Sequence, residues 1–365
     1  MGSRATGGAA AGHAASYYRR MTTAHNESKT QGPLRVGLIA SGDRIAPLRA
    51  AVDACVLVQP LGQAGMPQAA GLRDVAWYDD PRTLLSQATL EAVLLATSTR
   101  AAVELAGLAA ERGLHIWRVP PLARNFTEAA EVVTRAKRLP TIYRVASWWE
   151  YVTDHVWNEL HWPAEFKPRF SELLVSAPGP APNDWPAQPA ETAGGALATA
   201  GYDLLEALVA ARGLPDSVAA VKDRFRILPS GGLREVEDVA AAILHFPGGG
   251  GAVVRAAWDL LPVAQVLRHD GARLTVTLTN EEVALVDAQG AAADRRPLPG
   301  DFLASELLRF AEAVRGQARD RAAAPLDRHL AVSALLEAIY LSARTGDPES
   351  PTKFYRVQGW PEPQT

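Results

Sequence analysis

A proline-rich turn stands where this sequence would most readily place a catalytic group. The run 114–125, LHIWRVPPLARN, has the pattern of a buried strand that leads into a helix. In open α/β sheets, ligands and catalytic groups lie at the carboxyl ends of the strands. Here the turn holds Val119, Pro120 and Pro121, none of which can move a proton. Arg118 precedes the turn, but strand alternation directs its side chain to another face, and its guanidinium stays charged near neutral pH.

Aromatic side chains are concentrated at 147–162, where the sequence reads SWWEYVTDHVWNELHW with helical spacing. Trp148, Trp149 and Tyr151 are candidates for the wall of a substrate pocket, because flat aromatic faces suit sugar rings. The alternative is that these side chains belong to the core or to an interface, where buried aromatic residues more often lie. The sequence leaves both interpretations open.

Metal and covalent chemistry have no clear candidate. His155 and His161 are six residues apart, which is the wrong spacing for two ligands on one helical turn. Cys55 is the single cysteine, in a run that predicts a buried strand, and no Gly-x-Ser-x-Gly elbow occurs. The glycines at 248–251 predict a hairpin turn rather than a phosphate cradle, because no helix follows them.

The composition narrows the class of protein. The chain has 365 residues, 48% of them hydrophobic, and a net charge of −3, so no basic field favours nucleic acid. No apolar run is long enough to span a bilayer. A single cysteine fits a reducing compartment, and we expect a cytoplasmic protein. Residues 1–32 lack the apolar core of a secretory signal and predict a disordered tail.

The first half alternates strands and helices joined by short connections. Strand patterns occur at 34–40, 55–60, 74–80, 90–98, 114–119 and 141–146. The run 90–98 is apolar throughout, as is typical of a parallel strand covered on both faces. The alternation predicts a doubly wound parallel sheet over 33–146.

The second half has a different pattern. Strand-like runs occur at 170–176, 217–228, 238–247, 252–259, 263–268, 272–279 and 282–287, and helical runs at 195–213, 303–316 and 326–346. These predict an α+β domain over 147–350 with an open, mainly antiparallel sheet and helices on one side. Residues 351–365 are expected to form a C-terminal tail.

The ordered set of segments resembles the glucose–fructose oxidoreductase / inositol dehydrogenase / MocA (Gfo/Idh/MocA) family over residues 34–346. The resemblance rests on VGLIASG, EAVLLATSTRAAVELAGLAAERGLHI and PLARNFTEAAEVVTRAKR in the first half, and on GGALATAGYDLLEALVAARG and EDVAAAILHFPGGGGAVVRAAW in the second. It implies a Rossmann domain followed by an α+β domain whose open sheet often mediates oligomerisation. It also implies NAD(P)-dependent oxidation of sugars or polyols, provided that the chemical residues are present.

The family's Gly-x-Gly-x-x-Gly phosphate loop aligns with Ala-Ser-Gly-Asp-Arg-Ile, in which one glycine of three remains. The resemblance makes Gly42, Asp43 and Arg44 candidate cofactor contacts, together with Gly37 in the preceding strand. Asp43 would repel a pyrophosphate unless it caps a helix, whereas Arg44 could bind phosphate.

Other cofactor positions also depart from the family. Thr97 and Ser98 end the fourth strand, and the family's Pro-Asn there aligns with Ser98 and Thr99. The family's acidic residue for the adenosine ribose is missing after the second strand, where Gln59 or Gln63 could still donate a hydrogen bond. These losses predict no NAD(P) binding or weak binding.

The family's catalytic positions are occupied by Pro120, Thr199 and Asp203. Pro120 replaces the lysine of Glu-Lys-Pro, and Thr199 and Asp203 replace the aspartate and histidine of Gly-Gly-x-Leu-x-Asp-x-Gly-x-His. Asp203 could serve as a base in an apolar pocket, with a structural role as the alternative. Pro121 matches a position where the family's peptide bond is often cis, so we predict a cis bond at Pro120–Pro121 or just before it.

Two functions follow from the resemblance and these departures. The first is a redox-inactive member of the family that serves as a binding or partner protein, without a cofactor or with weak NAD(P) binding. The second is an NAD(P)-dependent oxidoreductase that acts on a sugar-like alcohol with Asp203 as the base. Either could hold a small sugar-like ligand.

Both faces of the run 238–247 are poor in charge. Ala240, Ala242, Leu244 and Phe246 share one face, and Ala241, Ile243 and His245 share the other. An exposed apolar face of this size is normally an interface. We therefore expect a homo-oligomer or hetero-complex through the second-half sheet, which a charge at Ile243 or Trp258 should break.

Overall fold

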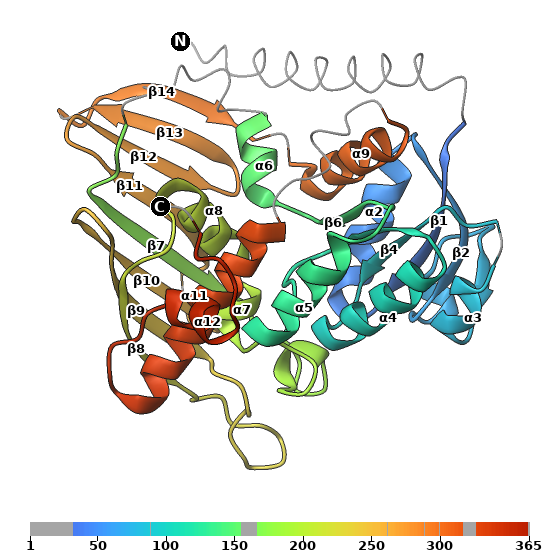
Figure 1. The fold of residues 1–365 in the computed structure, drawn as a ribbon, viewed down its shortest axis with the longest axis horizontal. Coiled ribbons are helices and arrows are strands. Elements are labelled where there is room, and N and C mark those ends of the chain that lie inside the picture. Colours follow the sequence, from blue (N-terminus) through green and yellow to red (C-terminus); the bar gives the residue numbers. More distant parts are fainter. Residues whose placement is uncertain are drawn as a thin grey trace, which may run out of the picture.

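The computed structural model describes residues 32–87, 89–154, 166–260, 262–287, 289–298, 300–316 and 326–363. Within them the chain forms two sheets that lie side by side, each with its own helices (Figure 1). Residues 1–31 of the predicted tail lie outside the described residues. So do His155 and His161.

The first sheet is parallel throughout. Its strands in spatial order are β3 (Ala76–Tyr78), β2 (Val58–Ala64), β1 (Leu34–Ala40), β4 (Ala92–Ala96), β5 (His115–Arg118) and β6 (Tyr143–Val145). Its helices are α2 (Ile45–Ala54), α3 (Pro81–Leu85), α4 (Thr99–Glu111) and α5 (Phe126–Ala136). The strand order reverses between β1 and β4, and this is where open α/β sheets form their ligand crevice. The predicted Rossmann sheet is confirmed.

One strand of this sheet lies later than the sequence predicts. Residues 55–57 end α2 and lead into β2, which begins at Val58 and not at Cys55. The register between β1 and β2 shifts after Val36, which pairs with Pro60, so that Gly37 pairs with Gly62. This irregularity accommodates a proline, which cannot donate to the ladder and ordinarily ends a strand pattern.

The second sheet is mainly antiparallel. Its order is β14 (Ala292–Pro297), β13 (Glu282–Asp287), β12 (Leu274–Thr279), β11 (Ala264–Asp270), β7 (Phe170–Ala177), β10 (Gly251–Trp258), β9 (Val239–His245) and β8 (Ser217–Asp223). Only the β7–β10 pair is parallel. The edge strand β14 was not predicted, because its sequence AADRRP is polar and charged, as edge strands often are.

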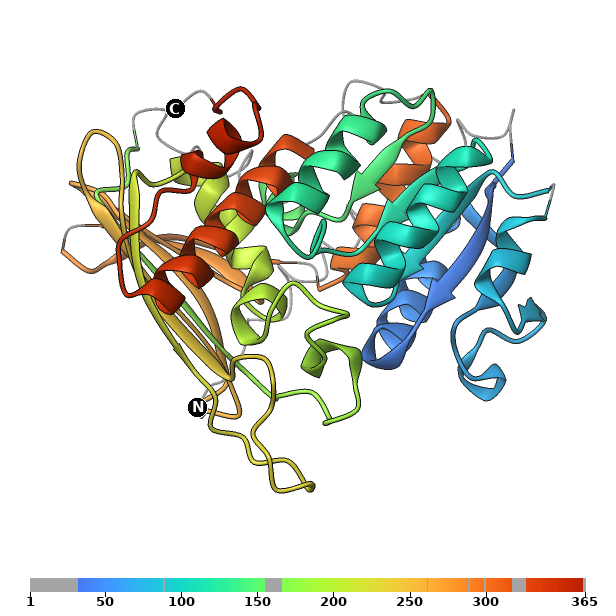
Figure 2. The ribbon, with the colours of Figure 1, turned by 60° about the horizontal axis from the view of Figure 1, so that its bottom comes forward.

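Helices cover one face of the second sheet and leave the other open (Figure 2). The covering helices are α7 (Ala196–Thr199), α8 (Tyr202–Arg212) and α11 (Leu326–Thr345). On β9, Ala240, Ala242 and Leu244 are buried beneath them, whereas Ile243 is 65% exposed on the open face. Trp258 is only 3% exposed, in a small cluster with Ala196 and Val236, so it does not lie on the open face as we expected.

Two helices lie where the two halves meet. The short helix α6 (Trp148–Val152) follows β6, and α9 (Phe302–Val314) packs on α2 within the core of the first sheet. The chain therefore returns to the first half late in the sequence.

The predicted tail at 351–365 contains α12 (Thr352–Val357), and the ring of its Tyr355 packs 4.8 Å from the ring of Phe126. No helix among the described residues is long and apolar enough to cross a membrane.

Candidate active site

The loop after β1 presents an open backbone at the crevice. Ser41 donates its N–H to Ala96 O, and its hydroxyl lies 2.8 Å from that of Thr97. Gly42 has φ +60°, a conformation that favours glycine, and it begins a single 3-10 turn before α2. Gly42 and Asp43 are exposed, and the Asp43 carboxylate lies 3.8 Å from Arg44 Nε. The loop thus keeps the glycine that an approaching phosphate needs.

Trp185 comes from the loop after β7 and lies against this turn. A Cβ at Gly42 would be 3.6 Å from the Trp185 ring, and the Arg44 guanidinium stands 5.9 Å from the ring centroid. The indole Nε1 and the Arg44 Nε are buried and lack hydrogen-bond partners in the described part of the chain. Arg44 Nε does face a carboxylate, since Asp43 Oδ1 lies 3.8 Å from it in an ion pair. The indole N–H is therefore the donor with unused capacity for an anion.

The same loop is fastened to the start of α4 by Glu191. Its carboxylate accepts from the Ser98 hydroxyl at 2.7 Å and from Arg100 Nη1 at 3.2 Å. Its carbonyl accepts from the Arg100 N–H. Ser98 also caps α4 by accepting from Ala101 N. The second half therefore reaches across the crevice to the end of β4, a contact between distant segments that the proline-rich loop sequence did not suggest.

Two predicted cofactor contacts have other roles in the structure. Gly37 lies inside β1, and a Cβ there would meet Leu90 at 3.1 Å, so its small size serves packing. The amide of Gln63 is committed to the following loop: it donates to Leu72 O and Val75 O and accepts from Leu72 N. Gln63 is therefore not free for a ribose.

The turn after β5 is built around Arg118. The Pro120–Pro121 bond is cis, as predicted. The Arg118 side chain is 1% exposed and donates to Pro121 O at 2.7 Å, Leu122 O at 3.0 Å and Val119 O at 3.4 Å. Its guanidinium is hydrogen-bonded to the turn, so it is not available to act on a substrate. The turn carries no proton donor toward the crevice.

Asp203 is the residue that the resemblance made a candidate base. It lies in the first turn of α8, and burial raises the pKa of its carboxyl to about 6, while the positive charge of Arg44 lowers it. The charge of Arg44, in the loop after β1, therefore acts on the α8 carboxyl. The Thr199 hydroxyl on α7 donates to Gly195 O at 2.8 Å, so Thr199 has a structural hydrogen bond at this family position.

The turn before α7 is held by a buried carboxylate, Glu237, which the sequence did not point to. Glu237 accepts from Gly195 N at 2.7 Å, from Leu197 N at 3.2 Å and from the Tyr340 hydroxyl at 2.8 Å. A Cβ at Gly195 would lie 2.0 Å from Glu237 O, so only glycine fits there. Burial raises the pKa of Glu237. Its role is to fix the turn that leads to Thr199 and Asp203.

The aromatic residues of α6 lie in the core. Trp148, Trp149 and Tyr151 are 5%, 9% and 2% exposed and belong to the main hydrophobic cluster. Tyr151 packs edge-on against Phe302 with ring centroids 5.6 Å apart. This placement favours the core alternative over the substrate-pocket one.

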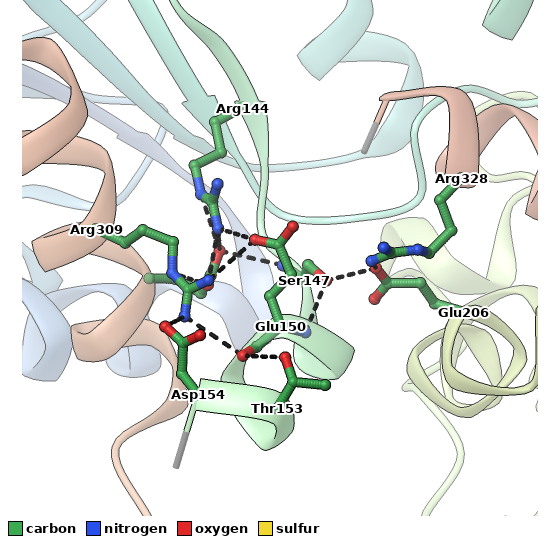
Figure 3. Close-up of polar contacts among 9 residues, drawn as sticks. Arg144, Ser147, Glu150, Thr153, Asp154, Glu206, Arg309 and Arg328 are labelled. Carbon is green, nitrogen blue, oxygen red and sulfur yellow. Dashed lines mark hydrogen bonds and ion pairs between the residues drawn. The ribbon is translucent and has the colours of Figure 1, made fainter. Parts of the chain in front are cut away.

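Beside α6, charged side chains form a buried network (Figure 3). Arg144 of β6 donates to Glu150 at 2.6 Å and to Glu306 of α9 at 3.0 Å. Arg309 of α9 pairs with Glu150 at 3.1 Å and with Asp154 at 2.5 Å. Arg144 and Glu306 are fully buried, so each needs the other to offset the cost of leaving water.

The network extends to α8 through Ser147. The Ser147 hydroxyl donates to Glu206 at 2.5 Å, and Arg328 of α11 lies 3.4 Å from the same carboxyl (Figure 3). Burial raises the pKa of Glu206 to about 8, which the Ser147 hydrogen bond and Arg328 oppose. Because Glu206 is one turn from Asp203, the negative charge of Asp203 raises its pKa further. The described residues contain no cluster that could hold a metal ion.

Comparison with solved structures matches nearly the whole chain. Levoglucosan dehydrogenase in complex with NADH and levoglucosan is 18% identical and has a TM-score of 0.69, covering 87% of this chain and 99% of that one. An oxidoreductase from Thermotoga maritima, 17% identical, has a TM-score of 0.71 and covers 88% and 99%. UDP-N-acetylglucosamine 3-dehydrogenase from Acidithiobacillus ferrooxidans, 18% identical, has a TM-score of 0.66 and covers 85% and 97%.

The chain shares the fold of these dehydrogenases. The two-domain architecture that the Gfo/Idh/MocA resemblance implied is thereby confirmed at the level of fold. No protein-family model matches the sequence, and no curated protein matches it.

The residues of the crevice fit one part of a dinucleotide better than the other. Gly42 and the unpartnered Trp185 Nε1 suit a pyrophosphate, whereas Arg44 already pairs with Asp43. At the adenosine side, β2 ends in Ala64, and no acid follows it before Arg73. The loop after β1 thus offers candidate phosphate contacts, and a ribose contact of the usual type is missing.

Proposed function

We propose that the chain is an oxidoreductase that binds NAD(P) weakly and acts on the CH–OH group of a sugar or polyol, with Asp203 as the proton-transferring residue. The observation that carries this proposal is the Asp203 carboxyl, whose pKa is raised to about 6 beside Arg44 of the phosphate loop. General bases are tuned toward the pH at which they operate, and perturbed carboxyls concentrate in active sites. The similar levoglucosan dehydrogenase, with its NADH and anhydrosugar, supports this substrate class.

The proposed reaction needs a bound nicotinamide cofactor and side chains of the protein. A bound nicotinamide would supply the hydride acceptor. Asp203 takes the hydroxyl proton, and the positive charge of Arg44 favours the ionised carboxyl that does so. Arg44 and Trp185 would hold the pyrophosphate, and Glu191 holds the Trp185 loop against α4.

A second candidate function is a redox-inactive binding or partner subunit. It is favoured by the turn after β5, where Pro120 replaces the lysine of the resembled family and the Arg118 guanidinium is engaged by carbonyl oxygens. With no proton donor there, proton transfer depends on Asp203 alone.

The two functions are separated by an oxidation assay with a panel of aldoses and polyols and either NAD or NADP. We expect slow turnover that rises with pH through about 6, because the ionised Asp203 carboxyl is the active form. Asp203→Asn should lower kcat by about a hundredfold or more, since it removes the general base.

Asp53→Asn is the matched control, because Asp53 is an exposed aspartate near the end of α2 and is not one of the candidate site residues. It should keep the activity of the wild type within about twofold. Absence of turnover with every alcohol, together with measurable dinucleotide binding, would favour the redox-inactive subunit.

A further inference from the structure

A second cavity lies away from the crevice, between α5, α11 and α12. Its volume is about 270 Å³, close to the lower limit of small-molecule sites. On α11 it is lined by Ser333, Glu337, Tyr340 and Arg344, which recur at helical spacing along one face. The start of α5 closes it on the opposite side.

The charged residues of this cavity are not equally available. Arg124 is engaged, because it pairs with Glu128 at 3.0 Å and donates to Ala190 O at 3.2 Å. Glu337 is engaged as well, since it accepts from Phe126 N at 2.7 Å. Arg344 is exposed and has no ion pair or hydrogen bond within the described ranges. Arg344 is therefore the cation that is free to meet a ligand.

The remaining wall is apolar. Ala123, Leu336, Leu341 and Phe354 line the cavity, and Phe354 is held 6.1 Å from the ring of Phe126. An apolar wall next to a free guanidinium suits an anion with a flat hydrophobic body, because the guanidinium pairs with a carboxylate in a planar fork.

We propose that this cavity binds a small aryl or alkyl carboxylate, with its carboxylate on Arg344 and its apolar body against Leu336 and Phe354. The proposal does not depend on the oxidoreductase function, because none of these residues belongs to the crevice. It assigns the chain a second ligand site.

The cavity shares its walls with the segment that reaches the crevice. Ala193 lines it, Arg124 holds the carbonyl of Ala190, and Tyr340 bonds the Glu237 carboxylate that fixes Gly195. A ligand in the cavity should therefore order residues 190–195, including Glu191 at the mouth of the crevice.

Calorimetric titration of the full chain with phenylacetate tests the site, and phenylacetamide is the neutral control of the same shape. We expect saturable binding of phenylacetate and binding of the amide that is weaker by about tenfold or more, because only the carboxylate pairs with a guanidinium. Arg344→Gln should reduce phenylacetate affinity to the level of the amide. Arg112→Gln, an exposed arginine at the end of α4, should leave it unchanged.

A second variant separates the cavity from a surface arginine that attracts any anion. Leu341→Trp fills the cavity and keeps Arg344, so it should abolish phenylacetate binding. Hydrogen exchange of the wild type should slow at residues 190–195 when phenylacetate is added. The proposal is overturned if phenylacetate gives no saturable binding, if the amide binds equally well, or if Arg344→Gln or Leu341→Trp binds phenylacetate like the wild type.

Discussion

Arg118 lies beneath the turn that follows β5, and its guanidinium donates to three carbonyl oxygens of that turn. The turn has more carbonyl groups than N–H groups, since Pro120 and Pro121 have no N–H. A long cation with several donors satisfies them at once. The structural role of Arg118 therefore follows from the two prolines that replace a catalytic sequence.

Replacing Arg118 by methionine should destabilise the fold by about 2–4 kcal/mol, because it leaves buried carbonyls unpaired while keeping most of the side-chain volume. Equilibrium unfolding in urea measures this loss. Arg112→Met, at an exposed position, should change the free energy of unfolding by less than about 0.5 kcal/mol. Equal stability of Arg118→Met and wild type would refute the supporting role.

Glu206 gives a residue-scale prediction for pH. Its carboxyl meets Ser147 from α6, Arg328 from α11, and the charges of Asp203 and Glu150, and its pKa is raised to about 8 from an ordinary 4.5. Between these values the folded state holds a proton that the unfolded state has released. Glu206 therefore lowers stability as pH rises through this window, by up to about 1.4 kcal/mol per unit.

Glu206→Gln should remove this pH-dependent loss of stability. Urea unfolding at about pH 5 and about pH 8 should show the variant gaining stability relative to the wild type as pH rises. A constant difference across the window would show that Glu206 is ionised in the folded state. Asp154→Asn, a partly exposed member of the same network, is the control.

The candidate site could be predicted only in part from residues. The resemblance made Arg44 a candidate cofactor contact and Asp203 a candidate base, and the structure brings their charges close enough to interact. Trp185 and Glu191 were missed, because a proline- and alanine-rich loop has no periodicity from which its contacts can be inferred. A tryptophan within such a loop was the available signal, since that side chain is seldom left in solvent.

At the scale of elements, the loop that carries Trp185 and Glu191 is tied to the first half through Glu191. Glu191→Ala should accelerate hydrogen exchange across 185–195, because it removes the acceptor of Ser98 and Arg100. The effect on global stability should be below about 1 kcal/mol, since the Arg100 side chain is about half exposed and its ion pair is screened by solvent. Hydrogen-exchange mass spectrometry at peptide resolution compares residues 185–195 with the rest of the chain.

Glu104→Ala is the matched control, because Glu104 also pairs with Arg100 but lies on α4 itself. It should leave exchange at 185–195 unchanged. Equal acceleration by both variants would mean that Arg100, and not the link to Glu191, controls the loop.

Element boundaries were predictable where the pattern was regular. The strands β4 and β9 follow apolar runs and lie close to their predicted ranges. The strand β2 was misplaced because Pro60 within it reads as a strand end, and only the shifted register with β1 makes it compatible. The helix α9 was predicted, but its packing against α2 could not be inferred, because it depends on a contact between segments far apart in sequence.

At the scale of the whole molecule, the open face of the second sheet remains a proposed interface. Val221, Ile243 and Val253 are 68%, 65% and 39% exposed on neighbouring strands β8, β9 and β10. We propose a homodimer that apposes two such faces, since paired sheet faces bury apolar side chains from both copies. Light scattering of the wild type should give the mass of a dimer.

Ile243→Glu should convert the dimer to a monomer, because it would place an unpaired charge in the interface. Val263→Glu is the control, since Val263 is 63% exposed and precedes β11, outside this patch. A wild-type monomer at about tens of micromolar would contradict the proposed interface.

The central claim is that the crevice between the phosphate loop and α8 binds a dinucleotide, and fluorescence titration with NADH and NADPH tests it most directly. We predict saturable but weak binding, about a hundredfold weaker than micromolar, because two loop glycines and the ribose acid are missing. Arg44→Gln should weaken it by a further tenfold or so, since Arg44 is a phosphate contact, whereas Arg112→Gln should not. Absence of saturable binding to either nucleotide, or binding that Arg44→Gln leaves unchanged, would contradict the account.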